Sequence, residues 1–326
     1  ELANLGVRVS NLEKKVGNIS WSGDARMQYQ HKLADGSRTE YEDSWNGRMR
    51  INVQGQVNDQ VTVNGRFVNE MDFKDGASSS TSMDRINAKW TPNDATYVTI
   101  GRQGVALDVT GTFWDEDGVF DGVAAGWDNG KVGVEAGYGR FKSAENEAKG
   151  WSGQDKTEAW YGKLTGHIAD AADVSAFYLK NAQKQDKGAQ VGENASAWGA
   201  GLSYGIGDFT IDGDYVKTQN TQAGDAALWT AGLTYGEVDT DKVGSWSLGA
   251  HYVKADKGSM FLGNTALDMG DQLGFSNDTN VKFWVAKAGV AVQKNVELDA
   301  YYNFAAKADE GEDPDDTWGI ELNYAF

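Results

Sequence analysis

Residues 318–326 read Trp-Gly-Ile-Glu-Leu-Asn-Tyr-Ala-Phe, and every second residue of this stretch is apolar. Residues 296–304, Val-Glu-Leu-Asp-Ala-Tyr-Tyr-Asn-Phe, repeat the alternation. Successive side chains of a β-strand point to opposite faces, so a period of two predicts strands with one apolar and one polar face. The same period begins at Ile19 and continues to Phe326. We therefore expect this whole part of the chain to be all-β.

The connections between these strands alternate in length. Seven short turns alternate with eight long polar loops, and this pattern predicts sixteen strands. An even strand number, with short turns at one end and long loops at the other, is typical of outer-membrane barrels. Residues 19–326 are thus expected to form a 16-stranded antiparallel transmembrane β-barrel. The long loops span about residues 32–43, 74–82, 103–118, 142–156, 184–194, 218–225, 256–279 and 307–316.

The tryptophans are ordered along the strand direction. One group lies beside short turns and another beside long loops, which predicts an aromatic girdle at each membrane interface. A water-soluble barrel turns its apolar face inward and gives no reason for this order. We therefore expect the apolar face to contact the lipid of a bacterial outer membrane. The first group is Trp21, Trp90, Trp127 and Trp246, and the second is Trp45, Trp160, Trp198, Trp229, Trp284 and Trp318.

Composition excludes several classes of protein. The 326 residues include 41 glycines and no cysteine, which excludes disulfide frameworks and thiolate metal sites. A net charge of −18 argues against a nucleic-acid partner, because such proteins neutralise phosphates. The scarcity of aliphatic residues predicts a barrel filled with water rather than with a packed core. The three histidines lie far apart in sequence, and none has a serine or carboxylate at a spacing typical of a catalytic site; they are His31, His167 and His251. We therefore expect no enzyme.

The first segment has a different period. Its apolar residues recur at intervals of three and four, which is the a/d seam of a coiled coil. We expect a short N-terminal α-helical coiled-coil segment over residues 1–18, the end of a stalk, followed by the barrel domain over residues 19–326. A single amphipathic helix lying on the barrel is the alternative. The seam consists of Leu2, Leu5, Val9, Leu12 and Val16.

Arginines concentrate in the polar phase of the first five strands. If the loop after the fifth strand folds into the lumen, its carboxylates face these arginines and set up a transverse field. Such a field orients dipolar solutes and disfavours apolar ones. The alternative is that these side chains are merely solvated in the lumen. The basic wall is Arg26, Arg48, Arg50, Arg66, Arg85 and Arg102, and the acidic residues of the loop region are Asp108, Asp115, Glu116, Asp117 and Asp121.

Three segments resemble general-diffusion outer-membrane porins. They are Gly-Arg-Met-Arg-Ile-Asn-Val-Gln-Gly at 47–55, Asp-Arg-Ile-Asn at 84–87 and Ile-Gly-Arg-Gln at 100–103. The resemblance covers the span from Ile19 to Phe326 and implies that Arg50 and Arg85 line the narrowest point of the channel. It also implies an inward-folded third loop and a homotrimer in contact with outer-membrane lipid and lipopolysaccharide. The Pro-Glu-Phe-Gly-Gly-Asp motif of that family is absent here.

The two ends of the chain carry further resemblances. Tyr324 and Phe326 resemble the terminal signal that the barrel-assembly machinery reads in this class. The seam at residues 2–16, running straight into the first strand, resembles the OmpM-type porins of diderm Firmicutes. In those proteins an S-layer-homology domain grips the cell wall. This narrower resemblance implies a periplasmic N-terminus and a full-length protein that tethers the outer membrane to peptidoglycan through an N-terminal domain missing from this sequence.

The sequence thus predicts a passive channel for small hydrophilic solutes and ions. A substrate-specific channel, for sugars for instance, is an alternative, but inward-phase aromatics such as Phe141, Tyr161 and Tyr301 are few and scattered. A mainly structural envelope anchor is a third possibility. No cofactor is expected. The acidic loop near the C-terminus could bind Ca²⁺ or Mg²⁺ through carboxylate oxygens, although a solvated loop is the simpler interpretation; its residues are Asp309, Glu310, Glu312 and Asp313.

Overall fold

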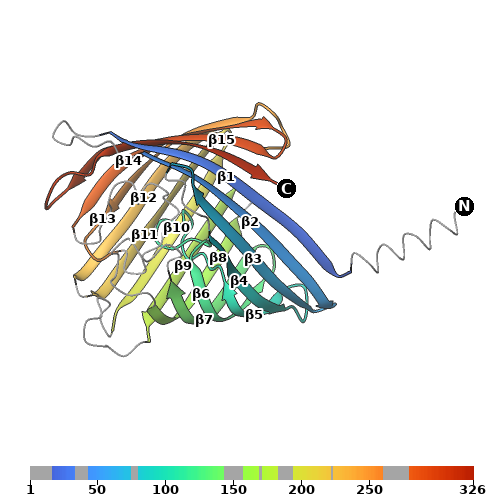
Figure 1. Cartoon of the computed structure of the whole chain (residues 1–326). Coiled ribbons are helices and arrows are strands. Elements are labelled where there is room, and N and C mark those ends of the chain that lie inside the picture. Colours follow the sequence, from blue (N-terminus) through green and yellow to red (C-terminus); the bar gives the residue numbers. More distant parts are fainter. Residues whose placement is uncertain are drawn as a thin grey trace, which may run out of the picture.

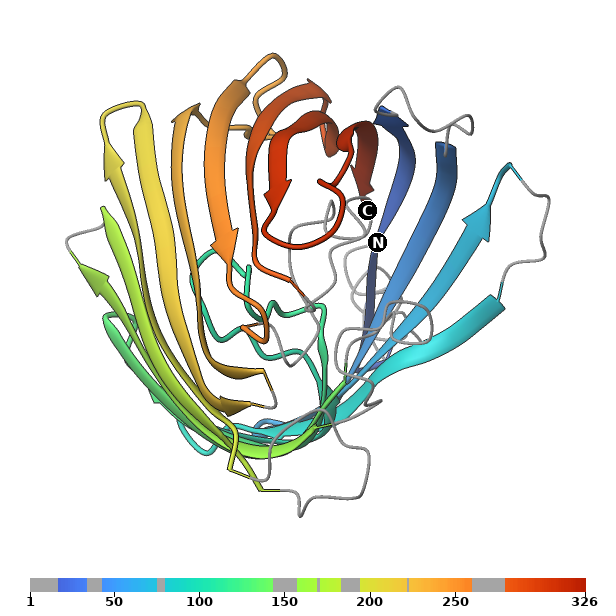
Figure 2. The ribbon, with the colours of Figure 1, turned by 90° about the vertical axis from the view of Figure 1, so that its left-hand side faces the viewer.

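A computed structural model of the chain shows a closed, all-antiparallel β-barrel in which each strand pairs with its neighbours in sequence (Figures 1 and 2). The structure describes residues 17–33, 43–74, 80–142, 157–168, 171–182, 194–221, 223–259 and 279–326. The strands are β1 (Ile19–Leu33), β2 (Asp43–Asn58), β3 (Val61–Asp72), β4 (Ser80–Trp90), β5 (Thr96–Gln103), β6 (Val119–Asp128), β7 (Val132–Lys142), β8 (Thr157–Ile168), β9 (Ala172–Asn181), β10 (Ser196–Ile206), β11 (Phe209–Thr221), β12 (Gly224–Gly236), β13 (Trp246–Ala255), β14 (Val281–Gln293), β15 (Val296–Ala308) and β16 (Asp316–Ala325).

The barrel closes where the first strand meets the last. The pairing of β1 with β16 runs from Asp24 opposite Ala325 to Leu33 opposite Asp316. Phe326 continues it, exchanging backbone hydrogen bonds of 2.7 and 2.9 Å with Gly23. A Cβ atom at Gly23 would stand 2.6 Å from the Phe326 ring, so a larger residue does not fit there. Closure pairs the two edge strands that an open sheet would expose.

The outer surface is apolar and carries both groups of tryptophans. Trp21 and Trp246, beside short turns, are 65% and 50% exposed, and Trp45, at the loop end of β2, is 52% exposed. Trp318 is less exposed because its ring packs 5.5 Å from that of Tyr29. Among the described residues, no helix is long and apolar enough to cross a membrane.

The predicted fold class needs correction at the N-terminus. The sixteen antiparallel strands match the alternating pattern, but the expected fold also contained a helical coiled coil, and that part is wrong. The described part of the chain is all-β and contains no helix. The seam residues Leu2, Leu5, Val9, Leu12 and Val16 lie outside the described residues, so nothing in the structure supports a coil.

The interior also differs from the prediction of a wholly water-filled barrel. A buried apolar cluster lines the inner wall toward the long-loop ends of several strands, and it includes Leu179, Val216, Leu228 and Phe283. Phe283-Trp284-Val285 is apolar in both phases, because Trp284 lies on the apolar outer face while Phe283 and Val285 pack into this cluster. A run that breaks the alternation in this way marks a strand segment whose inner face is also packed against apolar side chains.

Candidate pore constriction

The connection between β5 and β6, residues 104–118, lies inside the barrel; we call it the inner loop. Figure 2 shows this teal segment within the ring of strands. Asp214 on β11 accepts hydrogen bonds from the backbone N–H groups of Val109 (3.0 Å) and Thr110 (2.6 Å). Lys163 on β8 donates to the carbonyl of Ala106 at 2.7 Å. These contacts fix the first half of the loop to the wall opposite β2 and β3.

An aromatic cluster fixes the following part of the loop, residues 113 and 114, by packing. The ring of Phe113 stacks on that of Phe177 of β9 at a centroid distance of 5.5 Å. Trp114 meets Phe141 of β7 edge-on at 5.2 Å, and its side chain is fully buried. Tyr161 joins the cluster at 5.8 Å from Phe141. The expectation of scattered inward aromatics is therefore wrong for Phe141 and Tyr161, which share one buried cluster beneath the inner loop.

A buried carboxylate organises the backbone of the loop. Asp108 accepts hydrogen bonds from the N–H groups of Phe113 (2.8 Å) and Trp114 (2.9 Å). Burial, together with the nearby charge of Asp214, raises the pKa of Asp108 to about 7. Asp108 was predicted to face the arginines, but its carboxyl group instead holds the loop in shape.

The second half of the loop turns back to the arginine wall at its tip, residues 115–117. Asp117 receives a hydrogen bond from Nη1 of Arg50 at 2.7 Å and one from Nη1 of Arg66 at 3.2 Å. Burial favours a higher pKa for Asp117, but the guanidinium charges of Arg50, Arg48 and Arg66 outweigh it and hold the pKa below its usual value. Asp117 therefore stays ionised in front of the arginines while 44% of its side chain remains exposed.

The other acidic residues of this region take different positions. Asp115 accepts hydrogen bonds from the N–H groups of Asp117 (3.0 Å) and Gly118 (3.1 Å), which closes the turn at the tip. Glu116 is exposed. Asp121 lies on β6 and forms a bidentate pair with Arg102, with N to O distances of 2.6 and 2.8 Å. Of the five predicted acidic residues, Asp117 is the one whose carboxylate bridges two arginines of the wall.

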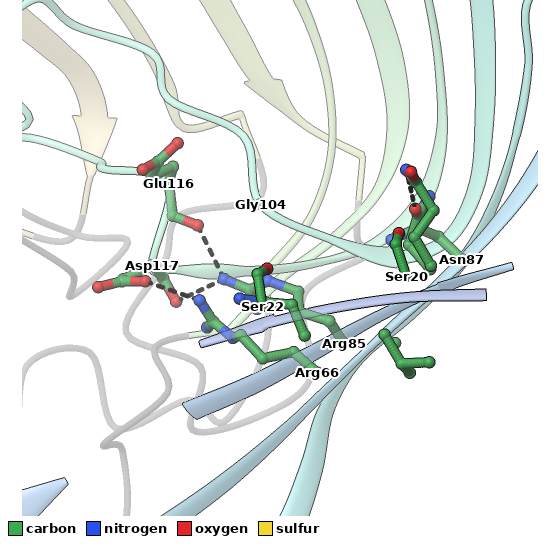
Figure 3. Close-up of a pocket in the computed structure, with 13 residues that line it drawn as sticks. Ser20, Ser22, Arg66, Arg85, Asn87, Gly104, Glu116 and Asp117 are labelled. Atoms are coloured by element: carbon green, nitrogen blue, oxygen red, sulfur yellow. Dashed lines mark hydrogen bonds and ion pairs between the residues drawn. The ribbon is translucent and has the colours of Figure 1, made fainter. Parts of the chain in front are cut away.

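Arg85 holds the tip of the inner loop. Its Nη2 donates to the carbonyl oxygens of Glu116 (2.8 Å), Asp117 (3.0 Å) and Gly118 (3.3 Å), and the residue is only 8% exposed. Figure 3 shows Arg66 and Arg85 both directed at this tip. Gly104 permits the close approach, because a Cβ atom there would stand 2.2 Å from the carbonyl oxygen of Glu116.

A β-bulge in β4 places two charged residues in the lumen together. Arg66 of β3 pairs with Arg85, whereas the next residue, Phe67, pairs with Met83, so Asp84 is the extra residue. Met83 and Ile86 are 40% and 55% exposed on the outer face, and Asp84 and Arg85 between them both face inward. Asp84 then pairs with Arg66 at 2.6 Å. Bulges commonly re-aim side chains in this way.

Two acidic partners of the arginines were not among the residues predicted from the sequence. Arg50 Nε donates to both oxygens of Asp24 on β1 at 2.9 Å. Arg26 lies 3.8 Å from Glu321 on β16, the strand that closes the barrel. Asp24 belongs to the inward phase of β1, so the alternating pattern could have identified it. The pairing with Glu321 required knowledge of the closure.

A polar cavity of about 450 Å³ lies between the tip and the wall formed by β1 to β4 (Figure 3). Arg66, Arg85, Glu116 and Asp117 are the charged residues of its lining. The rest of the polar lining is hydroxyl and amide groups, which can exchange hydrogen bonds with water and with neutral solutes alike; these residues are Ser20, Ser22, Asn52, Gln54, Asn64 and Asn87.

The remaining candidates do not form a site. Asp313 pairs with Lys307, and Asp309 accepts a hydrogen bond from Asn280 at 2.8 Å. Within the described ranges, no group of three or more His, Asp or Glu residues could hold a metal ion. The three histidines lie in different parts of the barrel, and each contacts one aspartate. His31 contacts Asp43, His167 contacts Asp173, and His251 contacts Asp212.

Comparisons with known proteins place the fold among outer-membrane porins. No family model and no curated protein sequence matches the chain. Solved structures do match: OmpF of Salmonella typhi in complex with daunomycin has a TM-score of 0.67 at 15% identity, covering 96% of this chain and 99% of that one. A mutant of the Rh. blastica porin gives 0.59 at 15% identity, covering 94% and 100%. The trimer form of OmpT, an outer membrane protein of Vibrio cholerae, gives 0.58 at 14%, covering 94% and 99%. At these identities the likeness concerns the fold.

Proposed function

We propose that this protein is a porin of the bacterial outer membrane, a passive diffusion channel for small hydrophilic solutes and ions. The observation that carries the proposal is the position of Asp117, which the inner loop brings from within the barrel to 2.7 Å from Arg50 and 3.2 Å from Arg66 of the wall. Fixed charges on the loop and on the wall hold ordered water, which a hydrophilic solute replaces with its own hydrogen bonds and an apolar solute does not. The barrel-wall arginines and the inner loop together form the constriction.

The buried state of the aromatic residues supports a general channel over a sugar-specific one. A sugar track needs aromatic faces open to the lumen, whereas Phe141 and Tyr161 are 1% exposed and Tyr301 is 8% exposed. The cavity beside the tip offers amides and hydroxyl groups instead. Recognition in this channel therefore rests on charge and hydrogen bonding.

Solute flux into liposomes tests this function. Proteoliposomes containing the purified chain are diluted into isotonic solutions of neutral sugars of increasing mass, and swelling is followed by light scattering. We expect rates that fall continuously with solute size and show no saturation with concentration. Saturation for one sugar, with no flux of others of the same size, would instead indicate a substrate-specific channel.

The expected partners extend this proposal. Phe326 is 59% exposed on the outer face and Tyr324 is 36% exposed, as suits a terminal strand that the barrel-assembly machinery reads. The outer aromatic and aliphatic surface suits lipid, lipopolysaccharide and contact with two further copies in a homotrimer. A periplasmic N-terminus follows if the short turns face the periplasm. The OmpM-type relationship and tethering to peptidoglycan stay predictions of the sequence, because residues 1–16 lie outside the described part.

A further inference from the structure

The six inward arginines differ in how their hydrogen-bond donors are used. Three of them, Arg50, Arg66 and Arg102, make hydrogen bonds to carboxylates, and Arg85 donates to carbonyl oxygens of the inner loop. Arg48 is different: its Nε is buried, and no residue in the described part of the chain accepts a hydrogen bond from it. A buried donor that stays unpaired loses its hydration without compensation.

Arg48 also faces a like charge across the strand pair. It is the register partner of Arg26, so both side chains leave the same inner face of β1 and β2 from directly opposed positions. Cβ atoms of such partners are about 5 Å apart, and like charges placed opposite each other destabilise a sheet. Nη1 of Arg26 lies 3.8 Å from a carboxylate oxygen of Glu321. Two guanidinium groups thus leave the same face of the wall from opposed positions.

We infer that Arg26 and Arg48 form a binding site for a small oxyanion, a carboxylate or phosphate group, on the long-loop side of the constriction. This inference rests on the proposed channel function. Arg50 contacts the tip of the inner loop, and Arg48 lies two residues nearer the long-loop end of β2. A solute entering from that end therefore meets Arg48 before it meets Asp117.

Hydrogen-bond geometry, more than net charge, selects the ligand. Glu70 is the other register partner of Arg48, and Asp24 and Asp117 also act on its charge, so the site is not strongly cationic. A guanidinium presents its donors as a planar fork that matches the two oxygens of a carboxylate or phosphate. Chloride cannot occupy such a fork bidentately. The site should therefore prefer oxyanions to chloride.

Competition between anions in planar bilayers tests the site. Chloride current through the purified full chain is recorded while inorganic phosphate or acetate is added at constant ionic strength. The wild type should show a saturable decrease of the current. Arg48→Gln should raise the half-blocking concentration about tenfold, in line with loss of a charge-assisted bond, and Arg48→Lys should also raise it because lysine lacks the fork.

Arg140→Gln is the matched control. It removes the same charge from β7, where the side chain is 50% exposed and lies 3.8 Å from Glu158, and it should leave the half-blocking concentration unchanged. Equal sensitivity of Arg48→Gln and the wild type would overturn the site while the channel function stands. Titration calorimetry with phosphate in detergent gives a readout that needs no conduction. Binding that Arg48→Gln abolishes, in a chain without ion current, would refute the channel and keep the site.

Discussion

The attachment of the inner-loop tip by Arg85 allows a quantitative prediction. Arg85→Gln removes the Nη2 donor that contacts three carbonyl oxygens at 2.8, 3.0 and 3.3 Å. A guanidinium nitrogen carries two hydrogens, so these contacts amount to about two full bonds. Hydrogen bonds from charged donors contribute about 1.5–3 kcal/mol each, which gives about 3–6 kcal/mol for the tip. That free energy corresponds to a factor of about 10² to 10⁴ in the population of a detached tip.

The rest of the loop should stay in place in this variant. Asp214, Lys163 and the aromatic cluster around Trp114 hold residues 106–114 independently of Arg85. The tip alone should therefore move, widening the constriction intermittently. Single-channel recordings should show a higher mean conductance and more open-channel noise than the wild type.

A conservative variant separates charge from geometry. Arg85→Lys keeps the charge but cannot reach three carbonyl oxygens with one planar group, so it should show the same change in weaker form. Circular dichroism checks that both variants retain the barrel. Conductance and noise identical to the wild type in a folded Arg85→Gln protein would refute the role of Arg85 as the attachment of the tip.

Three further predictions follow from the same geometry. Arg50→Gln leaves Asp24 and Asp117 without their main partner, so the reversal potential in a KCl gradient should shift toward cation selectivity; no shift would contradict a role of this charge in permeation. Burial raises the pKa of Asp108 to about 7, so the folded state binds a proton more readily than the unfolded chain. The stability that this group contributes should therefore decline as the pH rises from about 4 to about 7. The free energy of unfolding of the wild type, relative to that of Asp108→Asn, should be larger at pH 4.5 than at pH 7.5, and a difference independent of pH would count against a buried Asp108 carboxyl group. Gly104→Ala should displace the tip and change the single-channel conductance, because a Cβ atom there would stand 2.2 Å from the carbonyl oxygen of Glu116. Gly162→Ala is the control, because a Cβ atom at Gly162 meets nothing within 4 Å and the conductance should stay unchanged. Equal conductances in the two variants would speak against the close contact between Gly104 and Glu116.

Local periodicity made most of the barrel predictable. Alternation assigned the faces of strands such as β15 and β16, and it placed Arg50 and Arg66 in the lumen. Both features depend on a period of two, which neighbouring residues reveal. The inward position of the loop was implied instead by the resemblance to porins, which did not single out Asp117 among the five acidic residues.

Features that depend on distant contacts were not predictable in the same way. The anchors Asp214 and Lys163 lie on β11 and β8, far in sequence from the loop that they hold. The bulge at Asp84 and Arg85 does leave a local sign, two successive charged residues between the outward Met83 and Ile86. The apolar interior leaves one too, since Phe283-Trp284-Val285 interrupts the alternation.

Single-channel conductance of the purified wild-type chain in planar bilayers tests the central claim most directly. A water-filled lumen narrowed by fixed charges predicts discrete, long-lived steps whose size increases with KCl concentration. Exchanging Asp117 for Asn in the same measurement should move selectivity toward anions, because the carboxylate that Arg50 and Arg66 share is lost. A correctly folded barrel that conducts no ions at any salt concentration would contradict the account.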